Sequence, residues 1–334
     1  MASSEIKSAL IVGAGSIGRR HISNLRKLGL SKLAACDPHP ERLEYVAKEF
    51  QVECFPTIEV GLDKFPADAV LVCSPPAGHV AQAMQALQAG AHVFIEKPLS
   101  DRIDGVEELK EEAAKRGAVV QVGYNLRFHP AIQKLKELVE ARAVGKILWA
   151  HVEAGSYLPD WRPWQDYRKS YTARRELGGG ILLDGSHEID YMTWLFGAPR
   201  ELACMADHVS ELEVNVEDCA TILMRFADGT RADVHLDFIQ RSYSRYCSLV
   251  GPQGKVHWDL LSNSVQVLRP GKEAEVFKFE FEINEGYVAE LAHFIECVQN
   301  GARPRFTLED AILTLRIALA ARAAAEEKKW VRFE

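Results

Sequence analysis

A Glu96-Lys97-Pro98 tripeptide follows a short apolar run at residues 92–95 and could supply acid–base chemistry. Because Lys97 precedes a proline, its backbone is held out of the α region. A lysine whose pKa is lowered from about 10.4 by partial burial can exchange a proton with a substrate hydroxyl. We expect Lys97 to be catalytic, and Glu96 to position either Lys97 or part of a bound cofactor. The alternative is a surface ion pair after a strand.

A second candidate group begins at a run of three glycines, residues 178–180, and continues to Asp184 and His187. The glycines allow backbone to pass close to a flat ligand or to another chain segment. Asp184 and His187 are three residues apart at the expected start of a helix, so both can face one side. A carboxylate beside an imidazole raises its basicity, which suits a general base. The alternative makes Asp184 or Ser186 a helix N-cap and His187 a surface residue.

Residues 13–18, GAGSIG, fit the pattern G-x-G-x-x-G between an expected strand and an expected helix. Gly13 permits the tight turn, Gly15 lets backbone approach a pyrophosphate, and Gly18 allows close helix–sheet packing. Asp37 lies 19 residues beyond Gly18 and can accept both ribose hydroxyls, which favours NAD over NADP. Arg42 nearby could weaken that preference, or be a helix-surface residue.

The segment Ser74-Pro75-Pro76 ends another expected strand, at the sheet edge where such folds bind ligands. Two prolines fix a loop against which a dinucleotide could lie, although a plain rigid turn explains them equally well. His79 is either a cofactor contact or a polar residue at a helix start.

The elements that must position these residues alternate over the first 125 residues. Strands are expected at 8–12, 33–36, 69–73, 92–95 and 119–122, and helices at 17–28, 41–50, 79–89 and 103–116. This alternation predicts a parallel, doubly wound sheet.

The pattern changes after residue 125. Helices are expected at 130–143, 186–196, 287–300 and 308–328, and strands occupy most of 201–281, including a hairpin at 221–238. The expected fold class is therefore α/β: a Rossmann-type domain at 1–125, and an α+β domain with a large, mostly antiparallel sheet at 126–334.

Residues 157–171 contain five aromatic side chains among basic ones, including Trp161, Arg162 and Arg168. Aromatic faces stack on sugars, and arginine binds carboxylate or phosphate bidentately. The segment indicates an anionic or nucleotide-linked sugar. Equally, it could be a loop packed by its own aromatics at a subunit contact.

Composition excludes several classes of protein. A net charge of −7 without a basic block argues against nucleic-acid binding, and the apolar runs are too short to cross a membrane. Seven scattered cysteines suit free thiols in a reducing cytoplasm, and the scattered histidines and cysteines predict no metal site.

The order of these motifs, with GYNLRFHP at residues 123–130, Tyr287, Phe294 and a late Ala-rich helix, resembles the glucose–fructose oxidoreductase/inositol dehydrogenase/MocA family. The resemblance covers nearly the whole chain and implies an NAD(P)-dependent sugar or polyol oxidoreductase. It also implies a homodimer or homotetramer formed through the C-terminal sheet.

By the same resemblance, Lys97 and His187 are the catalytic pair, and Asp184 orients them or binds a substrate hydroxyl. Many members have Asp-x-x-x-His, whereas only Gly185 and Ser186 intervene here, which leaves both roles of Asp184 open. The expected cofactor contacts are Gly13, Gly15, Ser16, Ile17, Gly18, Asp37, Ser74, Pro75, His79, Glu96, Lys97 and Asn125. The expected substrate contacts are Lys97, Arg127, Trp161, Arg162, Arg168, Asp184 and His187.

Two other functions compete with a sugar dehydrogenase. One is a glycoside-cleaving enzyme that retains NAD and oxidises its substrate transiently, for which no net NADH would be released. The other is a non-catalytic NAD-sensing regulator, against which the presence of both Lys97 and His187 argues.

Overall fold

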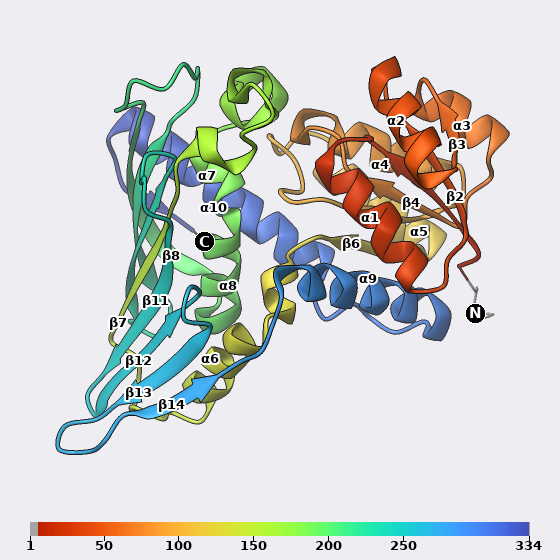
Figure 1. Cartoon of the computed structure of the whole chain (residues 1–334). Coiled ribbons are helices and arrows are strands. Elements are labelled where there is room, and N and C mark those ends of the chain that lie inside the picture. Colours follow the sequence, from red (N-terminus) through yellow and green to blue (C-terminus); the bar gives the residue numbers. More distant parts are fainter. Residues whose placement is uncertain (1–5, 334) are drawn as a thin grey trace. The chain divides into compact units, whose positions relative to one another are not determined.

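The computed structural model describes residues 6–333, and they divide into two compact units (Figure 1). The first unit contains residues up to Asn125 together with Ile283–Ile312, and the second contains Leu126–Glu282 and the residues from Leu313 onward. No helix among residues 6–333 is long and apolar enough to span a bilayer.

The first unit is built on a six-stranded parallel sheet in the order β3-β2-β1-β4-β5-β6. This is the strand order of a dinucleotide-binding Rossmann fold, as expected from the βαβ pattern. The strands are β1 (Ser8–Val12), β2 (Lys32–Cys36), β3 (Glu53–Phe55), β4 (Ala69–Val72), β5 (His92–Ile95) and β6 (Val120–Val122). The central strands β1 and β4 are buried along their whole length, which explains their continuous apolar sequence.

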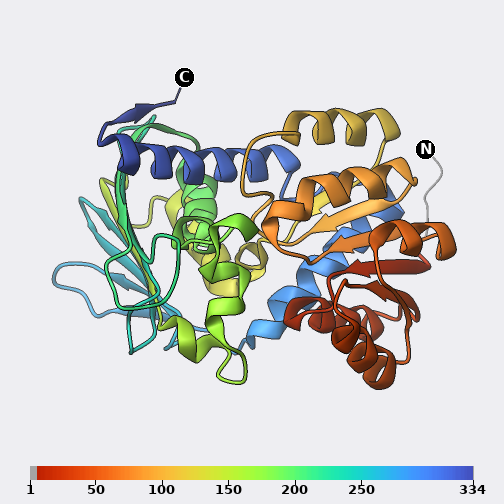
Figure 2. The ribbon, with the colours of Figure 1, turned by 90° about the horizontal axis from the view of Figure 1, so that it is seen from above.

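Helices cover both faces of this sheet, with α4 and α5 on one side and α1 and α9 on the other (Figure 2). They are α1 (Ser16–Lys27), α2 (Pro40–Phe50), α3 (Ile58–Lys64), α4 (His79–Gln88), α5 (Val106–Arg116) and α9 (Ile283–Asn300). Strand β3 and helix α3 were not expected from the sequence, because both are too short to show a clear period.

Helix α9 marks a difference from the expected domain boundaries, which assigned every residue after 125 to the second domain. Leu291, Phe294 and Val298 of α9 join the core formed by β1, β2 and α1. Asn284 also exchanges side-chain hydrogen bonds of 2.9 and 3.2 Å with Asn24 of α1. The helix belongs to the first unit because its apolar stripe is buried there.

The second unit contains a nine-stranded sheet in the order β14-β13-β12-β11-β7-β10-β9-β8-β15. Its strands are β7 (Trp149–Gly155), β8 (Pro199–Asp207), β9 (Cys219–Phe226), β10 (Arg231–Asp237), β11 (Ser244–Gly251), β12 (Gly254–Asp259), β13 (Ser264–Leu268), β14 (Glu275–Lys278) and β15 (Val331–Arg332). Every pairing is antiparallel except β7 with β10, so the expectation of a mostly antiparallel sheet is confirmed.

Strand β7 was not anticipated, although it lies near the middle of the sheet. Helices α6 (Pro130–Glu140), α7 (Ile181–Asp184) and α8 (Ser186–Phe196) pack on one face. The side chains of β7 alternate between buried and half-exposed, as expected when helices cover only one face. Helix α10 (Leu308–Glu327) contributes residues to both units.

Candidate functional site

The glycine motif forms the turn from β1 into α1. Gly13 has a φ of +101°, and a Cβ there would lie 2.7 Å from the Cys73 carbonyl carbon. A Cβ on Gly18 would overlap the Gly13 carbonyl oxygen, so both positions require glycine. A Cβ on Gly15, in contrast, would meet open space directly before Ser16, the first residue of α1. The turn therefore leaves room for a phosphate beside the first free N–H groups of a helix.

Asp37 follows β2 and is held in place by several donors. Its Oδ2 accepts from the backbone N–H of Ala14 at 2.8 Å, and its Oδ1 accepts from the backbone N–H of His39 at 2.9 Å. Burial opposes ionisation, but these donors and Arg42 lower the pKa of Asp37 overall. The Arg42 guanidinium lies 3.4 Å from Oδ2. An ionised carboxylate therefore stands beside the glycine turn, where it fits the ribose hydroxyls of a dinucleotide.

His79 links two loops at the carboxyl edge of the first sheet. It is buried, and its Nδ1 and Nε2 lie 2.9 Å from the Pro98 carbonyl oxygen and 2.8 Å from the Ser74 carbonyl oxygen. His79 was expected either to contact the cofactor or to be a polar residue at a helix start, and both of its ring nitrogens lie against backbone carbonyl oxygens. Ser74 is half-buried, and its hydroxyl donates to Gln82 at 2.6 Å.

Glu96 and Lys97 follow β5 at the same edge. The buried Glu96 carboxylate lies 2.6 Å from His21 Nε2 and accepts from the Lys97 backbone N–H at 3.2 Å. The Lys97–Pro98 peptide bond is cis, and Lys97 itself is half-buried. Sequence reasoning missed His21, although it lies three residues beyond Gly18 on the helix that the glycine motif begins.

In the second unit, Asp184 ends α7 and His187 begins the first turn of α8, and both are buried. The Asp184 carboxylate accepts from the Tyr171 hydroxyl at 2.9 Å and from the Thr172 hydroxyl at 3.0 Å. Burial and the Asp184 charge raise the pKa of Tyr171 well above its usual value, so the phenol remains a donor. The sequence did not predict either hydrogen bond, because Tyr171 and Thr172 lie in a separate loop from Asp184.

Two of the three glycines before α7 are required by close contacts within the chain itself. A Cβ on Gly179 would overlap the Tyr171 carbonyl oxygen, and one on Gly180 would overlap the Glu217 carboxylate. Arg322 donates to the same Glu217 at 2.9 Å. The run therefore lets α7 pack against the loop that carries Tyr171 and Thr172.

Arg127 was expected near the substrate or cofactor, and it is buried in a bidentate ion pair with Asp190. Its Nε and Nη2 each donate to one Asp190 carboxylate oxygen at 2.9 Å. Arg245 makes the same kind of pair with Glu188, at 2.7 and 3.0 Å. Both carboxylates are on α8, so these arginines fix the helix that carries His187. Asn125 is buried at the end of the first unit.

In the aromatic and basic segment at residues 157–171, Arg168 and Trp161 have defined side-chain partners. Arg168 is half-exposed and pairs with Asp166 at 2.8 Å and Glu213 at 3.0 Å. Trp161 donates to the Ser156 hydroxyl at 2.7 Å, and its ring packs edge-on against Phe238. The Arg162 charge partly opposes the rise in the pKa of Tyr171 that burial and Asp184 cause, so this guanidinium acts near Asp184.

Two family models match this chain. The model described as "Oxidoreductase family, NAD-binding Rossmann fold" matches residues 7–124, and the model described as "Oxidoreductase family, C-terminal alpha/beta domain" matches residues 136–333.

Individual proteins match over similar lengths. A myo-inositol 2-dehydrogenase of Thermotoga maritima is 28% identical over 97% of this chain and 98% of its own. A UDP-N-acetylglucosamine 3-dehydrogenase of Acidithiobacillus ferrooxidans is 28% identical over 78% of this chain and 76% of its own. The crystal structure of an inositol dehydrogenase homologue from Azotobacter vinelandii, complexed with NAD⁺, superposes with a TM-score of 0.89 at 20% identity. That comparison covers 99% of this chain and 98% of the other.

Proposed function

We propose a function from the premise that this chain belongs to the GFO/IDH/MocA oxidoreductase family. The proposed reaction is the transfer of a hydride between NAD and a hydroxyl-bearing carbon of a sugar or cyclic polyol. The chain is an NAD-dependent oxidoreductase with a Rossmann domain, and the substrate and residue roles are the proposed part. The observation that carries the proposal is the pairing of a complete dinucleotide turn with Lys97 at the carboxyl edge of the same sheet.

The cofactor residues are assigned by position. Gly13, Gly15, Ser16, Ile17 and Gly18 would surround the pyrophosphate, and Asp37 would accept the adenosine ribose hydroxyls. Ser74, Pro75, Glu96 and Asn125 complete the assigned contacts, and His79 acts by joining the Ser74 and Pro98 loops. An ionised Asp37 repels a 2′-phosphate, which favours NAD over NADP.

When bound, NAD supplies the hydride acceptor, and the protein must handle the proton of the substrate hydroxyl. We assign that proton to Lys97. Its protonated ammonium form can donate to a carbonyl oxygen, and its neutral amine form can accept a proton from a hydroxyl. His187 is the second acid–base group. Asp184 binds a substrate hydroxyl or orients His187, with Tyr171 and Thr172 holding its carboxylate.

The substrate class is proposed to be a polyhydroxylated ring, with an acidic or nucleotide-linked sugar as the specific candidate. Matched relatives are named as inositol and UDP-sugar dehydrogenases, which supports both. Arg162 is the cation assigned to an anionic group, since the Arg168 guanidinium is already paired with two carboxylates.

A substrate panel tests the proposal. Purified protein with NAD⁺ is mixed with inositols, neutral sugars, sugar acids and nucleotide sugars, and NADH is followed by absorbance. We expect net NADH from at least one ring polyol or sugar. Product release without net NADH would instead support a glycoside-cleaving enzyme, and cofactor binding without turnover of any panel member would contradict the proposed activity.

We also propose that the chain forms a homodimer or homotetramer through the face of the nine-stranded sheet that α6, α7 and α8 leave uncovered. Trp149, Met205, Leu223 and Val250 are exposed on strands of this sheet. Light scattering of the wild type and of Met205→Lys would show whether this face holds copies together. A wild-type monomer would reject the assembly.

A further inference from the structure

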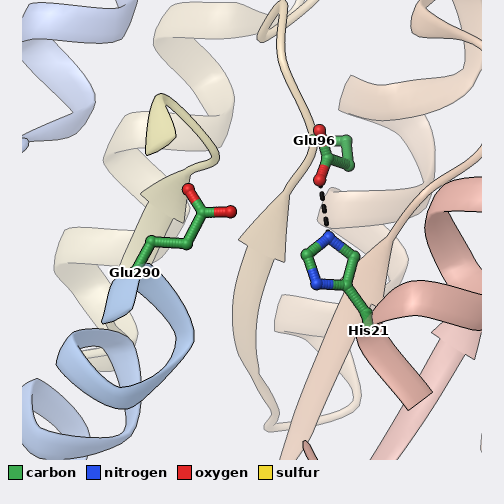
Figure 3. A group of neighbouring side chains, drawn as sticks. All are labelled: His21, Glu96 and Glu290. Atoms are coloured by element: carbon green, nitrogen blue, oxygen red, sulfur yellow. Dashed lines mark hydrogen bonds and ion pairs between the residues drawn. The ribbon is translucent and has the colours of Figure 1, made fainter. Parts of the chain in front are cut away.

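Three titratable side chains meet inside the first unit, one of them the neighbour of Lys97 in the sequence (Figure 3). His21 comes from α1, Glu96 follows β5, and Glu290 lies on α9. His21 and Glu290 are fully buried, and Glu96 is 7% exposed. One ligand-type atom from each lies within 4.8 Å of the others. Among residues 6–333, no other group of His, Cys, Asp and Glu meets that distance.

Apolar and aromatic side chains surround the cluster. The His21 ring makes edge contacts with Phe94 and Tyr287, at centroid distances of 5.4 and 6.1 Å. Phe94 packs in turn against Phe294. In such surroundings an uncompensated charge is strongly disfavoured.

The hydrogen bonds account for Glu96 but not for Glu290. Glu96 is bonded by His21 and by the Lys97 backbone N–H. Neither Glu290 oxygen has a hydrogen-bond partner within residues 6–333, and the same is true of His21 Nδ1 and Gln121 Oε1. Figure 3 shows the Glu290 side chain extending from α9 toward the His21–Glu96 pair, with no hydrogen bond drawn to either residue.

The charges near Glu290 do not neutralise it. Burial and the Glu96 carboxylate raise the pKa of Glu290 well above its usual range. Burial, Glu96 and Glu290 also raise the pKa of Cys73 on the sheet side, so this thiol stays uncharged. The cations Arg20 and Lys97 act on the Tyr287 hydroxyl, and Arg20 lies over the Tyr287 ring. The Glu290 carboxyl group thus lies near the negative Glu96 carboxylate, and no cation is hydrogen-bonded to either Glu290 oxygen within residues 6–333.

We propose that His21, Glu96 and Glu290 form a buried positioning network for Lys97, in which Glu290 stays a neutral acid and Glu96 is the single anion. The proposal rests on the proposed function, in which Lys97 handles the substrate proton. Glu96 fixes the Lys97 backbone N–H, and His21 fixes Glu96 to the helix that begins at the glycine turn. The network therefore connects the cofactor turn to the assigned acid–base residue.

A metal ion is the competing occupant of these donors. Histidine nitrogen and carboxylate oxygen bind zinc at about 2.0–2.2 Å each, which separates two such ligands by roughly 3 Å or more. His21 Nε2 and Glu96 Oε1 are only 2.6 Å apart, which is the distance of a direct hydrogen bond. The observed geometry favours a proton between them over an ion.

Glu290→Gln tests the neutral acid without needing any substrate. Glutamine keeps the shape of a protonated Glu290 and cannot ionise. Because the pKa of Glu290 is higher in the folded protein than in the unfolded chain, its contribution to wild-type stability is fully present below the unfolded-state pKa. That contribution is lost as the pH rises toward the folded-state pKa. We therefore expect the urea midpoints of wild type and Glu290→Gln to be similar near pH 5 and the variant's midpoint to be higher at pH 8. Glu49→Gln, at an exposed position of α2 in the same unit, should show no such pH-dependent difference.

Glu96→Gln tests the positioning of Lys97. We expect kcat to fall about 10- to 100-fold, because the placement of the Lys97 backbone N–H is disturbed. Removing an anion near Lys97 should also move the acidic limb of kcat/KM to lower pH, by about one unit. A purely structural role would leave that limb in place.

Two results would overturn the proposal. One is a Glu290→Gln variant less stable than wild type at every pH. The other is a Zn²⁺- or Mn²⁺-induced rise in wild-type stability that Glu290→Gln abolishes, which would assign the cluster to a metal. If instead no substrate is turned over while the stability results hold, the proposed function fails and Glu290 is still a neutral buried acid.

Discussion

The two units surround their proposed functional carboxylates, Glu96 and Asp184, with different hydrogen-bond partners. In the first, Glu96 is bonded by a titratable imidazole and lies near a second buried carboxyl group. In the second, Asp184 is bonded by the hydroxyls of Tyr171 and Thr172. The tyrosine and threonine hydroxyls keep their protons across the neutral range, whereas the charge state around Glu96 depends on two further titratable side chains. The comparison teaches that changes at Glu96 should alter the pH dependence of the step assigned to Lys97, whereas changes to the hydroxyl donors of Asp184 should act through geometry.

The largest effects should come from the two acid–base groups themselves. Lys97→Ala and His187→Ala should each lower kcat by about 10²- to 10⁴-fold, the usual contribution of general acid–base catalysis. NAD binding, measured by titration calorimetry, should be preserved. Loss of cofactor binding in either variant would reassign that residue to the cofactor.

Tyr171→Phe sharpens the comparison in the second unit. The substitution removes one hydrogen bond to a carboxylate, and such bonds contribute about 1.5–3 kcal/mol. We expect kcat to fall about tenfold or more, with the shape of its pH profile unchanged. A shift of the pH profile would show that Asp184 or Tyr171 titrates, which would remove the contrast with Glu96.

Asp37→Ser tests a third carboxylate, which is held by backbone N–H groups. Without the charge, and with Arg42 beside it, the ratio of kcat/KM for NADP to that for NAD should rise about tenfold. Steady-state kinetics with both cofactors gives the ratio. An unchanged ratio would mean that Asp37 does not face the ribose.

The smallest effects separate the two arginines of the aromatic segment. Arg162→Ala should raise KM for acidic sugars about tenfold and leave KM for neutral polyols nearly unchanged. Arg168→Ala should change either value less than about threefold, because its guanidinium is exposed and already paired. Equal effects on acidic and neutral substrates would remove the support for an anionic substrate.

Much of the fold could be predicted from local patterns, and the failures have physical causes. The glycine turn, Asp37 and the strand before Glu96 are neighbours in sequence, so their spacing was informative. Strand β3 has only three residues, too few to show a period. Strand β7 alternates over a short stretch and is followed by irregular turns, so it was not recognised as a strand. Helix α9 was assigned to the wrong unit because its apolar stripe does not reveal which core buries it.

The candidate site divides in the same way. Sequence identified Glu96, Lys97, Asp184 and His187 from residue type and spacing, and these assignments remain predictions. It also placed Arg127 and Arg168 near the substrate, where the structure shows both engaged by carboxylates. Pairing of a cation depends on which acids fold against it, and that information is absent from the local sequence.

By itself the sequence determined the dinucleotide turn, the parallel sheet and the family, because each depends on short-range spacing that steric and hydrogen-bonding rules fix. Only the tertiary structure decided the partners of the buried charges: His21 with Glu96, and Tyr171 and Thr172 with Asp184. Glu290 is the clearest case, since it is an ordinary acidic residue in a helix until folding removes it from water. Burial and charge pairing are long-range properties, and the free energy of each ionised group depends on neighbours that only the folded chain supplies.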